Sequence, residues 1–369
     1  MKRRIRYKRV FFAIFILVLI ILGISFFINK EEEPKKVDKV VQEKVTEPKD
    51  KEMSIVMVGD VLIHESVYKD AYDGEKYDFS SMFSYIGKYI KDYDLKFCNQ
   101  ESIIGGYELG IGGYPNFNSP DEIGEELVSL GFNMISLANN HSYDKGENAI
   151  LYSNSFWKTK NVITSGTSSS KEERENIKVH TKNGIKYAFI SYTTSLNGYN
   201  IPKGKEYLVN MYDADIAKRD IESIKEEVDV IIVSMHWGVE YDNTPTTKQK
   251  EIAEYLSSLG VNLIIGHHPH VVQPIEYINN TLVIYSLGNF ISNQLVLGEN
   301  QAIGLMLGLN INVDAESKVT FTDFNYELVY SYSLKSTKFK VIPFSEMKEE
   351  YLNNYESVKQ KYMNIVKLK

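Results

Sequence analysis

Residues 261–270 read VNLIIGHHPH, an apolar run that ends directly in three histidines. The run from Val261 to Ile265 is short and almost continuously apolar, which is typical of a strand that is buried on both faces. The same pattern, an apolar run followed at once by polar residues, recurs at residues 54–58, 95–98, 133–138, 187–192, 228–235 and 281–287. We therefore expect a set of buried strands whose carboxyl ends carry the chemistry of the protein.

Helical segments separate several of these strands. Ser119-Pro120-Asp121-Glu122 has the form of a capping box with proline at the first helical position, and its helix should stop at Gly131. Residues 246–249 (TTKQ) open a second helix in the same way, which ends near Gly260, and residues 213–227 predict a third. Strands that alternate with helices predict an α/β fold, in which ligands bind beyond the carboxyl ends of the strands.

The polar residues at these strand ends point to a metal site. They are carboxylates, imidazoles and amides, with no thiolate among them. Cys98 is the one cysteine of the chain, so neither an intrachain disulfide nor a cysteine-based zinc site can form. Such ligands suit Zn²⁺, Mn²⁺ or Fe²⁺, and a carboxylate-bridged pair of ions clamps the attacking and leaving oxygens of a displacement. The residues at the strand ends are Asp60, Glu101, Asn140, His141, His236, His268 and His270.

Six motifs occur in order between Asp60 and Phe290: GDVLIH, NQE, ANNHSYDKG, HWGVEY, GHHPHVVQ and YSLGNF. This series resembles the CapA family of poly-γ-glutamate capsule proteins, which is similar to the calcineurin-like metallophosphoesterases. The resemblance covers residues 53 to about 290 and continues more weakly through Pro343. It implies a layered sandwich of sheets flanked by helices, and a role in biosynthesis, export or attachment of capsular polyglutamate.

The resemblance also implies roles for single residues in a site for two divalent ions. Asp60 matches the first metal-binding aspartate, and Glu101 stands at the position of the bridging carboxylate. Asn140 matches an amide ligand, and His141 matches a general acid or transition-state donor that Asp144 would orient. The remaining imidazole ligands match His236, His268 and His270.

One position departs from the metallophosphoesterase pattern, which usually begins Asp-x-His. Leu62 stands at the third position here, so the first ion either lacks a ligand, binds weakly or recruits His64. His267 is a further candidate ligand, although a hydrogen bond to a backbone carbonyl would also explain it. Together with the longer bridge at Glu101, this departure argues against an ordinary phosphatase.

The N-terminal end carries a membrane signature. Residues 10–28 form a run of 19 residues without a charge, which as a helix spans roughly 29 Å, close to the hydrocarbon thickness of a bilayer. Residues 1–9 carry six basic residues and no acid, which predicts a cytoplasmic basic tail and an extracellular main domain. A cleaved signal peptide is the alternative, with Gly23-x-Ser25 as its best cleavage site.

The rest of the chain divides by composition. Residues 29–52 are mostly charged, with two prolines and no aromatic residue, and predict a spacer between membrane and domain. We expect the main domain over residues 53–343 and a C-terminal helix or tail over residues 344–369.

The net charge limits the kinds of partner that the protein is expected to bind, and the sequence leaves two main functions open. The net charge is −7, and the +6 of residues 1–9 leaves −13 for the remainder, which disfavours nucleic acid. The first hypothesis is a membrane-anchored extracellular hydrolase or transferase that acts on a phosphoester or amide bond of an anionic polymer. The second is a non-catalytic, polyanion-binding subunit among the synthase and exporter subunits of a capsule complex. A metallophosphoesterase of cell-wall polymers is a further alternative.

Overall fold

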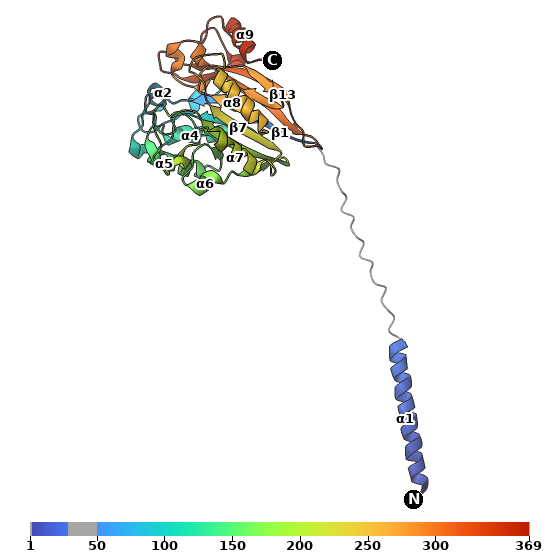
Figure 1. Ribbon diagram of the computed structural model, residues 1–369. Helices are drawn as coiled ribbons and strands as arrows, with labels where there is room; N and C mark the ends of the chain where they lie inside the picture. The colour runs from blue at the N-terminus through green and yellow to red at the C-terminus, as the bar shows by residue number, and fades with distance from the viewer. Residues whose placement is uncertain (1, 29–49, 369) are drawn as a thin grey trace. The chain divides into compact units, whose positions relative to one another are not determined.

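The structure, a computed structural model, describes residues 2–28 and 50–368, and of residues 2–9 and 25–28 it describes the helical backbone alone. The chain consists of two units, Met1–Glu47 and Pro48–Lys369. Figure 1 shows the elements of each unit along the chain.

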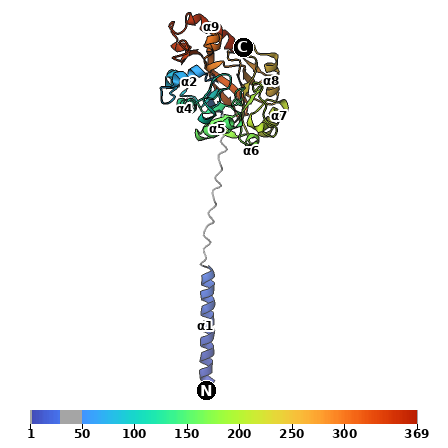
Figure 2. The ribbon, with the colours of Figure 1, turned by 90° about the vertical axis from the view of Figure 1, so that its left-hand side faces the viewer.

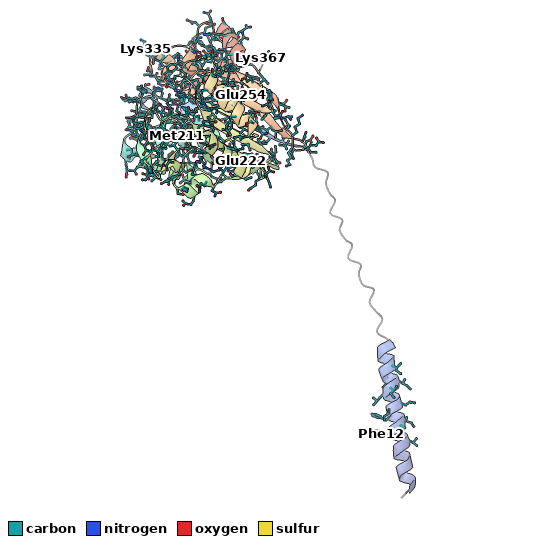
Figure 3. The ribbon with its side chains drawn as sticks, in the orientation of Figure 1. Phe12, Met211, Glu222, Glu254, Lys335 and Lys367 are labelled. Atoms are coloured by element: carbon teal, nitrogen blue, oxygen red, sulfur yellow. The ribbon has the colours of Figure 1, made fainter. Side chains whose placement is uncertain are left out.

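Helix α1 (Lys2–Ile28) belongs to the first unit. Its described apolar side chains are exposed, as Figure 3 illustrates for Phe12, of which 66% is accessible to solvent. Among the described residues, no helix combines the length and the hydropathy that a membrane span requires. The predicted linker lies outside the described residues up to position 49, and the predicted membrane anchor over residues 10–28 stays a prediction.

The second unit is built on two sheets. The first sheet has eight strands, seven of which pair in the order β14 (Lys340–Pro343), β13 (Val319–Tyr332), β12 (Ile303–Val313), β1 (Lys51–Val61), β2 (Leu95–Gln100), β3 (Met134–Ser136) and β4 (Ile163–Ser165), while β11 (Asn289–Ile291) pairs with β1. The second sheet has the order β5 (Val179–Lys182), β6 (Ile185–Thr193), β7 (Val230–His236), β8 (Leu263–His267), β10 (Thr281–Ile284) and β9 (Ile275–Ile278). Strands β1 to β4 run parallel, as do β6, β7, β8 and β10.

Side chains alternate between two cores along these strands, as the strand period of two requires. In β1, Ile55 and Met57 point into the core between the two sheets, and Val56 and Val58 point to the helices on the outer face. The inter-sheet core includes the edge-to-face pair of Phe97 on β2 with Phe189 on β6, whose ring centroids are 5.8 Å apart.

Helices cover the outer face of each sheet. The first sheet is covered by α2 (Glu65–Ala71), α3 (Gly87–Ile90), α4 (Asp121–Leu130) and α5 (Gly146–Thr159), and the second by α7 (Ala214–Ile224) and α8 (Thr247–Ser258). Figure 2 shows α2 and α4 on one side of the unit and α7 and α8 on the other. Glu222 and Glu254 lie on the solvent side of α7 and α8 (Figure 3). The fold is a mixed α/β fold with two sheets flanked by helices, which confirms the predicted class.

Shorter elements complete the unit. They are α6 (Lys171–Glu175), α9 (Tyr355–Val366) and the 3₁₀ helices η1 (Ser80–Phe83), η2 (Tyr107–Leu109), η3 (Glu206–Leu208), η4 (Gln294–Leu297), η5 (Asn300–Ala302) and η6 (Phe344–Glu346). Helix α9 contacts β13 and buries Val358, Tyr362 and Val366 in the inter-sheet core, so this part of the segment 344–369 is a packed helix. Strand β1 begins at Lys51, two residues before the predicted domain boundary, because its backbone pairs there with β12.

The two predicted capping boxes have different outcomes. At α8 the prediction is confirmed, since Thr246 Oγ1 accepts from the Gln249 backbone N–H (3.1 Å) and Gln249 Oε1 accepts from the Thr246 N–H (2.9 Å). At α4 it is wrong: Pro120 is the N-cap and no side chain caps the helix. The Ser119 hydroxyl is buried and donates to Ser102 Oγ at 2.8 Å, so it is not available to cap. Gly131 ends α4 in the left-handed region, as predicted.

Glycines allow strands from both sheets to approach closely where the site forms. A Cβ on Gly59 would lie 1.9 Å from the Gly288 carbonyl oxygen, and one on Gly266 would lie 2.0 Å from the Tyr285 carbonyl oxygen. Any larger residue would therefore push the connection between β10 and β11 away from β1 or β8. Asp60 and His267 each follow one of these glycines, so the close approach fixes where their side chains start.

The burial of Cys98 gives a test of the layered core. Cys98 is fully buried among the residues between the first sheet and its helices, and burial raises the pKa of its thiol well above the usual value. Because alkylation then requires unfolding, we predict that iodoacetamide at pH 8 modifies Cys98 at least about 10³-fold more slowly in the native protein than in urea. Mass spectrometry of timed samples measures both rates, and native labelling within a factor of ten of the urea rate would contradict this packing.

Candidate metal centre

Asp60, near the end of β1 in the first sheet, contacts two imidazoles from the second sheet. It is fully buried; its Oδ1 lies 3.0 Å from His267 Nδ1 and its Oδ2 lies 3.1 Å from His270 Nδ1. Asn99, near the end of β2, donates to Oδ1 at 2.8 Å. Burial by itself would raise the pKa of Asp60, but the hydrogen bonds and charges of the two histidines outweigh it and hold the pKa well below the usual value. Asp60 is therefore a carboxylate in the folded protein.

Glu101, directly after β2, is a buried carboxyl group without a hydrogen bond. Its side chain has no exposed surface, and neither carboxylate oxygen has a partner among the described residues. The Nε2 atoms of His236 and His270 are the near polar atoms, at 3.5 and 3.6 Å from Oε1. Burial raises the pKa of Glu101 far above its usual value. Two orphaned acceptors facing imidazoles are what a cation site offers in the absence of its ion.

Of the imidazoles around Glu101, those of His236 and His268 are in the neutral form that ligation needs. Burial opposes protonation of His270, but the neighbouring Glu101 and Asp60 outweigh it and raise the pKa of His270 to about 9. His236 ends β7, and its Nε2 lies 3.1 Å from His268 Nδ1 and 2.8 Å from Asn140 Oδ1. Burial and the neighbouring imidazole lower the pKa of His236 well below its usual value, and burial together with His270 lowers the pKa of His268 to about 4. His236 and His268 each place a ring nitrogen within 4.8 Å of a Glu101 oxygen, and a neutral imidazole is the form that binds a cation.

Among the described residues, three groups of side chains have ligand atoms within 4.8 Å of one another. The groups are Asp60 with Glu101 and His270, Glu101 with His236 and His268, and Glu240 with His268 and His270. Glu101 belongs to the first two groups, so its carboxylate is shared by two sets of potential ligands. Below, the metal-capable cluster means Asp60, Glu101, His236, His268 and His270.

The backbone after β8 sets the direction of two of these imidazoles. His268 and His270 have φ angles of 97° and 56°, a region that costs a non-glycine residue on the order of 1–3 kcal/mol. Pro269 between them accepts a hydrogen bond from the Tyr241 N–H at 2.8 Å. The strain is thus held by the surrounding loops, and it turns both rings toward Glu101.

His141 forms a pair with Asp144 beside the cluster. His141 Nδ1 lies 2.7 Å from Asp144 Oδ2, which is the contact predicted from the sequence, and the same oxygen accepts from the Phe117 N–H at 2.7 Å. The His141 ring packs edge-to-face on Phe117 with centroids 4.6 Å apart. His141 belongs to none of the three metal-capable groups, so its Nε2 is the ring nitrogen left for a bound substrate.

The structure separates His64 and His267 from the other candidate ligands. Neither belongs to a metal-capable group among the described residues. His64 Nδ1 accepts from the Asn293 N–H at 3.1 Å, and burial lowers its pKa to about 4. His267 uses Nδ1 on Asp60, and its buried Nε2 has no partner among the described residues. His267 therefore holds Asp60 from the second sheet.

Three asparagines in the site were not predicted. Asn99 holds Asp60, as described above. Asn289 Oδ1 lies 3.1 Å from His270 Nδ1. Asn197 Oδ1 accepts from Asn140 Nδ2 at 3.2 Å, and Asn197 Nδ2 lies 3.3 Å from His141 Nδ1. Asn99 and Asn289 stand in the NQE and YSLGNF motifs at strand ends, so their position was a usable signal. Asn197 lies in a loop whose sequence carries no comparable signal.

The site opens into a cavity of about 860 Å³. Asn140, His141 and His270 line it, together with His64 and Glu240. A substrate group in this cavity can thus contact both the metal-capable cluster and the His141–Asp144 pair.

The unpartnered carboxyl group of Glu101 gives a prediction for the metal-free protein. Its pKa is raised on folding, so the folded state binds the proton more tightly and the free energy of unfolding falls as pH rises above about 4.5, by up to about 1.4 kcal/mol per pH unit. Glu101→Gln removes this term. We predict that with EDTA the variant is more stable than the parent and that the difference widens from pH 5 to pH 7, measured by urea unfolding.

Glu222→Gln, on the exposed face of α7, is the matched control and should leave stability within about 0.5 kcal/mol of the parent at each pH. A Glu101→Gln variant that is less stable than the parent at pH 7 without metal would show that Glu101 has a partner that the geometry does not contain.

Comparison with known proteins supports the resemblance to capsule proteins. The family model described as bacterial capsule synthesis protein PGA_cap matches residues 54–294. The PGA biosynthesis protein CapA of Bacillus subtilis (strain 168) is 29% identical over 299 residues, which cover 78% of this chain and 73% of that protein. The capsule biosynthesis protein CapA of Bacillus anthracis is 25% identical over 287 residues, covering 75% of this chain and 67% of that protein.

Among solved structures, the NAD nucleotidase of Haemophilus influenzae is similar with a TM-score of 0.47 and 17% identity, over 87% of this chain and 57% of that one. The present chain thus spans little more than half of that nucleotidase. Because the family model matches well over half of the chain and includes every residue of the metal-capable cluster, the protein belongs to the bacterial capsule synthesis family PGA_cap.

Proposed function

We propose that the protein is a metal-dependent hydrolase or transferase of capsule biosynthesis, with the domain architecture of a calcineurin-like metallophosphoesterase. The observation that carries the proposal is the buried, unpartnered carboxyl group of Glu101 between two sets of potential ligands. A purely structural site would not keep two acceptors without donors at a cost of several kcal/mol.

The donor set fits two divalent ions. Asp60 and His270 on one side of Glu101, and His236 and His268 on the other, would hold them, with Asn140 as a further ligand. Carboxylates and neutral imidazoles suit Mn²⁺, Zn²⁺ or Fe²⁺. Bound ions of this kind supply an activated water and neutralise negative charge on the reacting group.

The protein's own residues then account for proton movement. Asp144 holds His141 Nδ1, so a proton on that nitrogen is fixed and Nε2 faces the cavity as the exchanging atom. His141 in its protonated form donates to the leaving atom of the substrate, a contribution of about 10²–10⁴-fold to the rate. Phe117 packs on the ring and keeps its orientation.

The substrate that we propose is an anionic capsular polymer, cleaved or joined at an amide or phosphoester bond. Membership of the capsule synthesis family supports this choice over a nucleotide. Synthase and exporter subunits of the capsule complex are the partners that we propose, and the negative charge of the chain argues against nucleic acid.

Three variants separate ligation from proton transfer. We predict that His141→Ala keeps its bound metal and loses activity by about 10²–10⁴-fold, because His141 touches the substrate and not the ions. His268→Ala should lose both metal and activity. Asp144→Asn should keep the metal and show an intermediate rate. Metal analysis and capsule attachment or polymer hydrolysis, measured side by side, give the result.

The matched control is His180→Ala, since His180 lies on the edge strand β5 and takes no part in the site. Full biological function in His141→Ala with full metal content would contradict the enzyme, and the non-catalytic polyanion-binding subunit would replace it.

We also propose that residues 10–28 anchor the protein in the cell membrane, with residues 30–369 outside the cell. The uncharged run after six basic residues supports this arrangement. We predict that the protein stays in the membrane pellet after alkaline carbonate extraction and that N-terminal sequencing finds residues before Val10. A mature start near Phe26 would show that the segment is a cleaved signal peptide.

A further inference from the structure

The cavity has an outer part whose walls differ from the metal-capable cluster. Beyond the histidines, its walls are made mainly of carboxamide, tyrosine and aliphatic side chains. We use the term outer pocket for Tyr114, Asn116, Asn197, Tyr199, Asn293 and Leu297, all of which line this cavity. Tyr114 and Leu297 are exposed by 77% and 57%, so they form the rim that a substrate meets first.

One hydrogen-bonding group of the outer pocket is oriented by its neighbour. The Tyr199 hydroxyl donates to Asn116 Oδ1 at 2.7 Å, which fixes the carboxamide and leaves its NH₂ group as a donor. An oriented amide donor in an uncharged wall matches a ligand that carries a C=O group, as an amide does.

The charges of the cavity walls disfavour an anion in the outer pocket. No lysine or arginine is among the described residues that line it, and Glu240 adds a carboxyl group. An anionic group that entered the outer pocket would lose hydration without gaining a cationic partner. Positive charge would come from ions at the metal-capable cluster alone, at the inner end of the cavity.

We propose that the outer pocket binds an uncharged, amide-bearing segment of the substrate, while the negatively charged reacting group lies at the metal-capable cluster. The second half of this statement rests on the proposed function, and the first half rests on the pocket walls. The carboxamides pair with the amide groups, and Tyr114 and Leu297 cover their apolar edges. The bond that reacts then lies where a charged segment meets an uncharged one.

A matched pair of ligands tests the charge preference. Both are γ-linked tetramers of glutamate with one terminal carboxylate; in one the other α-carboxylates are free, and in the other they are carboxamides. Calorimetry uses the full chain with His141→Ala, loaded with Mn²⁺, so that turnover does not interfere. We predict that the carboxamide tetramer binds at least about 10-fold more tightly.

Two substitutions locate the preference in the outer pocket. Tyr199→Phe frees Asn116 to rotate and should weaken binding of the carboxamide tetramer by about 3- to 10-fold. Asn116→Lys adds a cation at an exposed position and should shift the preference toward the carboxylate tetramer. Tyr277→Phe, an exposed tyrosine on β9 away from the cavity, is the control and should change neither affinity.

Equal or tighter binding of the carboxylate tetramer would overturn the proposal, as would the absence of binding by both ligands or an unchanged preference in Asn116→Lys. Failure of the proposed function looks different. If the carboxamide preference and its response to Asn116→Lys are found while the metal-loaded parent turns over no polymer, the outer pocket is supported and the catalytic role is lost.

Discussion

The buried carboxyl group of Glu101 is the constraint on which the rest of the site depends. It has neither a hydrogen bond nor solvent, and imidazole nitrogens of His236 and His270 lie 3.5 and 3.6 Å from its Oε1. Such a group lowers the stability of the folded chain unless a cation completes it. Its neighbours are organised accordingly: Asp60 is kept ionised, His236 and His268 are kept neutral, and strained backbone turns the final histidines inward.

The site exists because two sheets meet there. Asp60 and Glu101 come from the ends of parallel strands in the first sheet, and His236 and the final histidines come from the second. The inter-sheet core holds these edges in register, and His267 Nδ1 of the second sheet lies 3.0 Å from Asp60 Oδ1 of the first. Gly59 and Gly266 allow the connection between β10 and β11 to pass close to β1 and β8, directly before Asp60 and His267. Packing far from the cavity therefore controls the distances within it.

Much of this arrangement could be predicted from the sequence, because apolar runs followed by Asp60, His236 or His268 are unusual in combination. The α/β class and the Asp144–His141 contact follow from pattern and offset along the chain. The capping box at residues 119–122 failed because burial of Ser119 overrode a local preference. Asn197 could not be predicted, since an asparagine in a polar loop has no distinguishing period and its position depends on tertiary packing.

The proposal on which the function depends is that Glu101 bridges two divalent ions. Anomalous diffraction from crystals of the full chain grown with Mn²⁺, recorded at the manganese absorption edge, tests it most directly. The account predicts two peaks that share the Glu101 carboxylate, one toward Asp60 and His270 and the other toward His236 and His268. No peak at Glu101, or a single peak that leaves its oxygens unliganded, would contradict it.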